Sequence, residues 1–584
     1  MRRLLKYLAR YRLRYVAGIL CLVATAELGM RVPYLLKEAI DAIGAGADAS
    51  RAGVLALWIA AIAALQAIVR TSSRVLIFNI GRDVEYDLRN DLFAHLEKLS
   101  LSFYQRQQTG DLMSRLVNDV TAVRMLLGPG ILNLVNTPVY YVYALGYMLS
   151  LDPRLTIAAL LPYPIILLVV KRFSRRLMDE TLRVQEGLAA LSSQVQENLT
   201  GIHVVRAYAC EETETQRFAE LNESFREASM KLARTRGQMM PIMRTASSVG
   251  TLVVLWFGGI EVIRGRLSLG DLVAFIAYLN MLAWPTMALG WMLSILQRGR
   301  AAMQRLEHVF TTEPDIRDPE PCRDLPAIRG SIEFRNVSFR YAAAHANGEE
   351  STPPTLHGIS FQLRPGQKLA LVGRTGSGKS TVAALLARLF DVDDGQILLD
   401  GEDLRDLPVA QLRRAVAVVP QQPFLFSTTV RENIRFAVDA ADDVAVERAA
   451  RIAGVDEDVD TFPKRYDTMV GERGITLSGG QKQRLTLARA LLADPRVLVL
   501  DDSLSSVDTR TERRILSALD EVMRGRTSIV IAHRISTIQD ADVIVVLADG
   551  RVAEFGDHVS LLARNGAYAE MFRQQRLEEE LAEL

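Results

Sequence analysis

Six apolar stretches dominate the first half of the chain, and each is long enough to cross a membrane. They occupy roughly residues 15–40, 53–80, 130–151, 154–173, 245–264 and 270–296. An α-helix rises about 1.5 Å per residue, so about 20 apolar residues cross a hydrocarbon layer of ~30 Å, and a helix satisfies its own backbone hydrogen bonds there. The pattern therefore predicts an α-helical domain with six membrane spans.

Basic residues before the first stretch predict its orientation. They are Arg2, Arg3, Lys6, Arg10, Arg12 and Arg14. Positive charge favours the cytoplasmic side, so we expect the N-terminus in the cytoplasm of an integral membrane protein, in a bacterial inner (plasma) membrane, with the C-terminal half cytoplasmic after six spans. The first stretch contains Glu27 and Arg31 and no small-residue cleavage site, which favours a retained span over a signal peptide.

The links between stretches alternate in length. Those at about 81–129 and 174–244 are long, charged and apolar at helical spacing, so we expect helices that continue into the cytoplasm. Ser102–Gln105 and Ala207–Cys210 sit at expected reversal points, where helix ends could dock on a partner domain.

A second, water-soluble domain is expected after residue 312. The segment 313–330 is rich in proline and charge and is interpreted as a linker between a membrane domain at 1–312 and an α/β domain at 331–584. In the second domain, short β-rich runs alternate with helical patterns.

The formal net charge of +1 gives no overall field that would attract nucleic acid. The three cysteines, Cys21, Cys210 and Cys322, lack metal-ligand spacing and are interpreted as unpaired thiols.

A glycine-rich loop in the second domain has the pattern of a P-loop. It follows the strand-like run Lys368–Val372 and opens a helical pattern. Glycines let backbone N–H groups wrap phosphates, and the N-terminus of a helix adds positive potential. The residues expected to bind ATP here are Gly373, Thr375, Gly376, Ser377, Gly378, Lys379, Ser380 and Thr381. Lys379 would reach the β- and γ-phosphates, and the Ser380 hydroxyl would ligate Mg²⁺.

Two further motifs accompany the loop. Arg496–Leu500 is a buried-strand pattern that ends in Asp501, a carboxylate placed to hold Mg²⁺ directly or through water. Ser478, Gly479, Gly480 and Gln481 follow Leu477 and open a helical pattern about 20 residues earlier. They would offer N–H groups and a hydroxyl to a phosphate, and the plain structural alternative is a capped helix start.

The string Leu477–Gln481 strongly resembles the ABC transporter signature, and six spans before such a domain resemble the type IV exporter fold. The resemblance implies that Tyr341 stacks on adenine and that Gln421 links Mg²⁺ to the membrane domain. It also implies that Asp508 belongs to the D-loop and that His533 contacts the γ-phosphate as a catalytic residue, beside Gln421. In this family two domains sandwich two ATP molecules, each between one chain's P-loop and the other chain's signature, so one chain cannot complete a site.

One residue departs from the family pattern. In this family the aspartate that ends the Walker B strand is normally followed by a glutamate, which positions the attacking water. Here that aspartate is Asp501, and it is followed by Asp502. Aspartate is one methylene shorter, and a misplacement of about 1 Å can cost ~10²-fold in rate. The chain resembles the aspartate-bearing half of heterodimeric exporters, with a slow site of its own. A homodimer that hydrolyses slowly, or one whose aspartate reaches the water after a small strand shift, is the alternative.

The transported molecule is not specified by the sequence, although a hydrophobic, amphipathic or lipid-like substrate fits the family. Trp284, Met287 and Trp291 recur at i, i+3 and i+7, and so do the aromatic residues Tyr140, Tyr143 and Tyr147. These faces could line a pocket, or pack helices, or anchor them at the interface. Glu27 and Arg31, one turn apart inside a span, are either functional or mutually neutralising.

Other classes also remain open. A lipid flippase would use the same parts, and an ATP-gated channel or regulator would not accumulate a substrate uphill. The six spans disfavour a soluble ABC ATPase acting on ribosomes or DNA. An importer is disfavoured because importers usually keep the two domains on separate chains.

Overall fold

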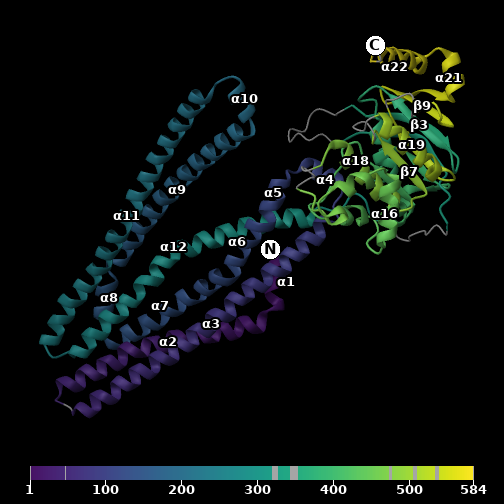
Figure 1. The fold of residues 1–584 in the computed structure, drawn as a ribbon. Coiled ribbons are helices and arrows are strands. Elements are labelled where there is room, and N and C mark those ends of the chain that lie inside the picture. The colour runs from purple at the N-terminus through teal and green to yellow at the C-terminus, as the bar shows by residue number, and fades with distance from the viewer. Residues whose placement is uncertain are drawn as a thin grey trace. The chain divides into compact units, whose positions relative to one another are not determined.

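The computed structural model describes residues 2–46, 48–318, 327–341, 353–471, 477–503, 509–532 and 538–582. The chain divides into two compact units, one of Met1–Glu97 with Gly110–Thr311 and one of Lys98–Thr109 with Thr312–Leu584. Figure 1 shows their elements, which we describe unit by unit.

The first unit is helical among its described residues. Its α-helices are α1 (Arg2–Arg10), α2 (Arg12–Gly44), α3 (Ala49–Leu96), α5 (Thr109–Ser114), α6 (Val120–Met125), α7 (Ile131–Leu151), α8 (Pro153–Leu160), α9 (Tyr163–Thr200), α10 (Ile202–Ala207), α11 (Glu211–Ile263) and α12 (Leu269–Thr311). Two π-helical turns, η1 (Arg115–Asp119) and η2 (Leu126–Gly130), flank α6. Helices α9 and α11 run side by side and are joined through α10 (Figure 1).

The predicted helices of the first domain are present, with one interruption. Five of the apolar stretches fall on α2, α3, α7, α11 and α12, whereas the stretch at 154–173 is split between α8 and α9. The break lies at Leu161 and Pro162, and a proline there removes a backbone donor that a continuous helix would need. By length and composition alone, Arg12–Gly44 and Ser50–Leu96 could each cross a membrane, and shorter apolar stretches occur at Ser248–Ile263 and Leu269–Leu282.

Polar side chains join the end of α2 to the start of α12. The Asp41 carboxylate accepts hydrogen bonds from the Ser268 hydroxyl at 2.8 Å and from the Gly270 N–H at 3.0 Å. Lys37 Nζ lies 2.7 Å from the Asp271 carboxylate. A Cβ atom at Gly270 would lie 2.5 Å from the Lys37 carbonyl oxygen, so the approach requires glycine. We call these five residues the α2–α12 clasp.

The aromatic faces have different outcomes. Tyr140, Tyr143 and Tyr147 are partly buried and pack against the core of α2, α7, α8, α11 and α12, which favours the packing interpretation for them. The Trp291 side chain is 45% exposed. The side chains of Trp284 and Met287 lie outside the described part of the structure.

The second unit contains two sheets. Its strands are β1 (Ile332–Phe339), β2 (Leu356–Leu363), β3 (Lys368–Gly373), β4 (Asp394–Leu399), β5 (Glu402–Asp403), β6 (Val416–Val419), β7 (Val497–Asp501), β8 (Thr527–Ile531), β9 (Val543–Ala548) and β10 (Arg551–Gly556). An antiparallel sheet has the order β2-β1-β4-β5. The larger sheet has the order β10-β9-β3-β8-β7-β6 and is parallel except for β10.

Helices and two 3₁₀ turns accompany the sheets in the described part of this unit. They are α4 (Leu101–Arg106), α13 (Lys379–Leu386), α14 (Val409–Ala415), α15 (Val430–Arg435), α16 (Asp443–Ile452), α17 (Asp456–Thr461), α18 (Gly479–Leu492), α19 (Thr509–Met523), α21 (His558–Arg564) and α22 (Ala567–Ala582), with 3₁₀ turns η3 (Leu404–Asp406) and η4 (Arg465–Asp467). The predicted α/β domain is thereby confirmed.

The reversal segment around Ser102 belongs to this unit rather than to the helical one. The Ser100 hydroxyl accepts hydrogen bonds from the N–H groups of Asp315 and Ile316 at 2.8 and 3.2 Å. The Ser102 hydroxyl donates to the Asp315 carboxylate. These bonds attach α4 to the segment that opens the second unit.

A buried asparagine in α15 connects two parts of the second unit. Asn433 is fully buried; its amide donates to the carbonyl oxygens of Phe426 and Thr429, and its Oδ1 accepts from the N–H of Phe426 and from Arg489 of α18. Arg489 also donates to the backbone oxygens of Asn433 and Phe424 at 2.8 and 3.1 Å. Burial lowers the pKa of the Arg489 guanidinium, so its partners are needed to hold the charge.

We expect Asn433→Ala to destabilise the protein by about 2–4 kcal/mol, because it leaves buried donors and acceptors unpaired. Denaturant unfolding followed by fluorescence measures the change. Asn222→Ala, at an exposed position of α11, serves as the control. A cost below about 0.5 kcal/mol for Asn433→Ala would contradict the role given to its side chain.

Candidate functional site

The glycine-rich loop lies between β3 and α13, as the sequence predicts. Gly373, Gly376 and Gly378 have φ values of 152°, 84° and 99°, which side-chain-bearing residues rarely adopt. A Cβ atom at Gly373 would lie 2.2 Å from the Leu547 carbonyl oxygen, so β3 and β9 exclude any other residue there. The loop can therefore turn its backbone N–H groups toward one point.

Lys379 is the buried cation of this loop. Its ammonium donates to the carbonyl oxygens of Gly373 at 2.7 Å and Arg374 at 2.9 Å. Burial lowers the pKa of Lys379, and the nearby carboxylates of Asp501 and Asp502 partly oppose that effect. A negatively charged ligand would stabilise the buried ammonium in the same way.

A second buried group also fits a phosphate. The Ser377 Oγ atom is buried and has no hydrogen-bond partner among the described residues. A hydroxyl in this position can donate to a phosphate oxygen, which would remove the cost of burying it unpaired. The loop therefore fits the phosphates of a nucleoside triphosphate by its hydrogen-bond donors as well as by its backbone shape.

The parallel strands bring the acidic residues to the same edge. Because β3, β7 and β8 are parallel neighbours, their carboxyl ends carry Gly373, Asp501 and Ile531 side by side. Asp501 is buried, at 7% exposure. Asp502 adopts φ 45° and its N–H donates to the Ile531 carbonyl oxygen at 2.8 Å. Aspartate tolerates this left-handed backbone better than most residues.

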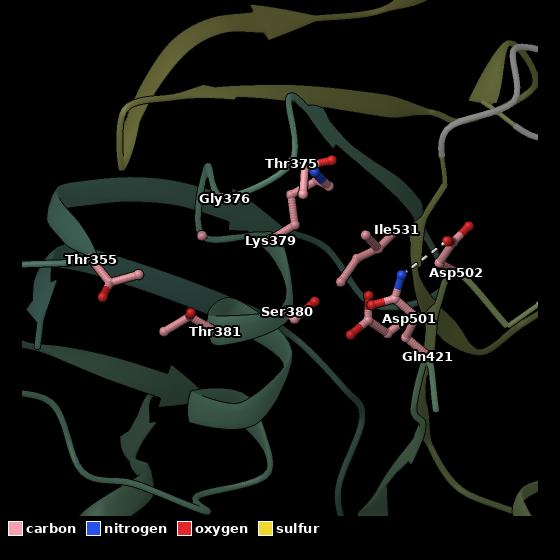
Figure 2. A pocket seen from close by; sticks show the side chains of 11 residues that line it. Thr355, Thr375, Gly376, Lys379, Ser380, Thr381, Gln421, Asp501, Asp502 and Ile531 are labelled. Carbon is pink, nitrogen blue, oxygen red and sulfur yellow. Dashed lines mark hydrogen bonds between the residues drawn. The ribbon is translucent and has the colours of Figure 1, made fainter. Parts of the chain in front are cut away.

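Gln421 reaches the same place from the end of β6. Its Nε2 atom donates to the Asp502 Oδ2 atom at 3.3 Å, as Figure 2 shows. The amide and the two carboxylates form a polar group opposite Ser380 and Lys379 (Figure 2). Two carboxylates beside a serine hydroxyl are oxygen ligands of the kind that Mg²⁺ prefers.

Loop and carboxylates enclose one cavity of about 210 Å³. It is lined by Thr355, Thr375, Gly376, Gly378, Lys379, Ser380, Thr381, Gln421, Asp501, Asp502 and Ile531. Nine of these were singled out from the sequence, whereas Thr355 and Ile531 were not. Ile531 ends a strand parallel to β3, so the strand-end rule could have found it. Thr355 precedes an antiparallel strand and carries no comparable signal in the sequence.

Tyr341 lies near the cavity without being among its lining residues. Its hydroxyl donates to Thr381 Oγ1 at 3.2 Å, and its ring meets Phe339 and Phe390 edge to face. Adenine stacking on Tyr341 stays a prediction. His533 and Asp508 lie outside the described residues, so their expected roles also stay predictions.

The signature residues form the start of α18. Ser478 and Gln481 make a capping box, in which the Ser478 hydroxyl accepts from the Gln481 N–H at 3.2 Å and the Gln481 side chain accepts from the Ser478 N–H at 2.9 Å. Gln481 also donates to Asp458 at 3.0 Å, and Arg484 pairs with the same carboxylate at 2.8 Å. The capped helix start is therefore present. Ser478 and Gly479 are exposed.

The loop and the carboxylates define a P-loop nucleotide-binding protein, and comparison with known proteins gives the family. Residues 15–286 match the family model of the ABC transporter transmembrane region, and residues 356–505 match that of the ABC transporter. The chain belongs to the ABC exporters that fuse a membrane domain to an ATP-binding domain. It is an integral membrane ATPase that couples hydrolysis to transport.

Several relatives match along almost their whole length. The "Probable multidrug resistance ABC transporter ATP-binding/permease protein YheI" of Bacillus subtilis (strain 168) is 36% identical over 97% of this chain and 96% of its own. The "ATP-dependent lipid A-core flippase" of Syntrophus aciditrophicus (strain SB) is 34% identical over 100% of this chain and 95% of its own. A solved bacterial Atm1-family ABC exporter with ATP bound superposes with a TM-score of 0.80, at 30% identity, over 97% of this chain and 99% of that one.

Proposed function

We propose that the chain is one half of a heterodimeric exporter of a hydrophobic or amphipathic substrate, and that its own ATP site is slow. The observation that carries this proposal is Asp502, which stands where the family pattern has glutamate. Its short side chain already accepts a hydrogen bond from Gln421. A carboxylate that is one methylene short holds the attacking water poorly, and about 1 Å of misplacement costs ~10²-fold.

The remaining parts of the site support ATP binding by this chain. Mg²⁺-ATP supplies the phosphoanhydride bond whose cleavage drives transport. The Lys379 ammonium would exchange the carbonyl oxygens of Gly373 and Arg374 for phosphate oxygens. Ser380 and Asp501 would hold Mg²⁺, with Gln421 beside them. Ser377 would donate to a phosphate.

Two surfaces support a second chain. The exposed Ser478 and Gly479 at the start of α18 are available to a nucleotide held by another P-loop. In the helical unit, an open groove of about 500 Å³ lies on α9 and α11 and is mostly apolar. Its apolar residues are Leu191, Val195, Leu199 and Phe218. Apolar surface of this kind is typical of an interface.

The purified chain alone is expected to bind Mg²⁺-ATP and to hydrolyse it about 10²-fold more slowly than the complete transporter. The complete transporter is the chain co-expressed with its partner half, which we expect to carry Asp-Glu in place of Asp501 and Asp502. A fluorescent nucleotide measures binding, and phosphate release measures turnover. Equal turnover by the single chain would contradict the heterodimer and favour a homodimer.

Uphill accumulation of substrate in proteoliposomes separates an exporter from an ATP-gated channel or regulator. We expect ATP-dependent accumulation against a gradient. A flux that only runs downhill when ATP is present would contradict export.

The orientation of the protein is tested by protease access to the second unit in right-side-out and inside-out vesicles. We expect this unit on the cytoplasmic side of a bacterial inner membrane.

A further inference from the structure

A charged pair lies inside the first predicted span, where three helices of the same unit meet. Arg31 Nε donates to Glu27 Oε1 at 2.9 Å, one turn along α2. The Tyr147 hydroxyl of α7 donates to the same oxygen at 3.2 Å. The Glu27 carboxylate therefore has two donors, one from its own helix and one from a neighbour. We call Glu27, Arg31 and Tyr147 the α2 polar cluster.

Packing fixes the position of this cluster. The Tyr147 ring stacks on Tyr278 of α12 with 5.5 Å between centroids and 25° between planes. Tyr278 is fully buried, and its hydroxyl donates to the Met30 carbonyl oxygen of α2 at 2.9 Å. Residues of α2, α7 and α12 thus support one another, so Glu27 and Tyr147 are held in place before any ligand arrives.

The cluster opens onto an exposed stripe of α2. The Arg31 side chain is 58% exposed and the Glu27 side chain 29%. Tyr34, 40% exposed, continues the stripe about one turn further. A guanidinium that faces lipid tails in the middle of a span is costly, so intramembrane charges almost always face the interior of a bundle or a water-filled path. We therefore expect this exposed face of α2 to border other protein or a water-filled path rather than lipid tails.

Arg31 has more side-chain surface available to a ligand than Glu27. The Glu27 oxygen that Arg31 contacts also receives the Tyr147 hydroxyl, whereas more than half of the Arg31 side chain faces outward. Guanidinium groups bind planar or tetrahedral oxyanions through two N–H groups at once. The ring of Tyr34 beside it offers a surface for an apolar chain.

We propose that the α2 polar cluster recognises the oxyanionic head of an amphipathic substrate, with Arg31 as the group that binds it. This names a substrate class and rests on the proposed export function. The shared chemistry is a phosphate or carboxylate head on an apolar chain. It can come from a soluble amphiphile or from an anionic membrane lipid.

The test measures equilibrium binding of radiolabelled dodecyl phosphate, below its micelle concentration, to the full-length transporter in nanodiscs of zwitterionic lipid. EDTA prevents hydrolysis, so the result does not depend on which site hydrolyses ATP or on whether the second chain is a copy or a partner. Arg31→Gln is expected to weaken binding at least tenfold. Glu27→Gln is expected to tighten it about threefold, because the competing carboxylate is gone. Dodecyltrimethylammonium should bind all forms equally weakly.

Arg264→Gln is the matched control. Arg264, the residue that follows α11, pairs with Glu261 at i, i+3, with side-chain exposures of 57% and 24% that resemble those of the α2 pair. Its binding should equal that of the unaltered protein. Unchanged binding of dodecyl phosphate in Arg31→Gln would overturn the proposal. Binding of dodecyltrimethylammonium to the unaltered protein that is lost in Glu27→Gln would also overturn it.

Two further arms separate the remaining explanations. If anionic lipid is the occupant, raising phosphatidylglycerol in the nanodiscs should compete with dodecyl phosphate in the unaltered protein and not in Arg31→Gln. Absence of competition would assign the site to soluble amphiphiles, which also agrees with the proposal. Loss of assembly in Arg31→Gln, seen by size-exclusion chromatography, with binding per folded transporter unchanged, would make Arg31 a packing residue and overturn it.

Discussion

Gly480→Asp is expected to lower the ATP turnover of the complete transporter about 10²–10³-fold, whereas Lys379→Ala should leave measurable turnover at saturating ATP. Gly480 opens α18, whose exposed start would meet the nucleotide of the partner's fast site. Removing phosphate stabilisation where bonds break has effects of that size. In the proposed heterodimer, Lys379 would belong to this chain's own slow site, where ATP would mainly hold the two ATP-binding domains together.

The Gly480 change also adds a negative charge beside a phosphate without weakening the helix. An acidic residue in the first turn is favoured by the helix dipole, and aspartate has a higher helix propensity than glycine. The capping box between Ser478 and Gln481 is left intact. Thermal unfolding should therefore change little, and lost activity would not come from misfolding. Gly480→Ala, which adds no charge, is the matched control and should retain far more activity.

Phosphate release and uptake into vesicles are measured for both variants in the same co-expressed pair. Equal losses in Gly480→Asp and Lys379→Ala would indicate two equivalent sites and contradict the heterodimer. A larger loss in Lys379→Ala would mean that the fast site belongs to this chain.

Asp502→Glu is expected to raise ATP turnover by the single chain up to ~10²-fold, because the added methylene restores the reach of the carboxylate. In the complete transporter the same change should make the slow site hydrolytic and loosen the coupling of hydrolysis to transport. Two local effects oppose the gain. The backbone at Asp502 has φ 45°, which suits aspartate better than glutamate. The hydrogen bond from Gln421 to Asp502 must also change when the carboxylate moves.

Asp502→Asn is the decisive companion variant because it keeps the shape and removes the charge. If Asp502 does little in hydrolysis, the already low turnover of the single chain should change less than twofold. A further tenfold fall in Asp502→Asn would show that the aspartate works as the catalytic carboxylate. That outcome would favour a homodimer and contradict the slow-site assignment.

The sequence predicts which residues lie together at the candidate nucleotide site because parallel strands dictate where their ends meet. Gly373 and Asp501 each end an apolar run, and the carboxyl ends of parallel neighbours must meet at one edge. Their approach therefore needs no side-chain detail. Thr355 was missed because it reaches the cavity from the antiparallel sheet, whose position against the larger sheet depends on packing between distant segments.

Three features of the structure could not be predicted from local sequence patterns alone. The break at Leu161 and Pro162 interrupts an apolar stretch that reads as one span, although the proline is visible in the sequence. The hydrogen bonds of Ser100 to Asp315 and Ile316 join residues about 215 positions apart, so no local pattern assigns α4 to the second unit. The capping box of Ser478 and Gln481 shows that the helix cap and the proposed phosphate contact would use the same residues, so no sequence pattern separates them.

The α2–α12 clasp has a consequence for the synthesis of the protein. Asp41 meets Gly270, 229 residues later in the chain, and Lys37 meets Asp271. A ribosome adding 5–20 residues per second takes about 10–50 s to cover that interval. During this time Lys37 and Asp41 have already left the ribosome while their partners have not yet been made. Helix α2 therefore reaches these polar contacts only when α12 has been made, and the clasp closes at the end of insertion.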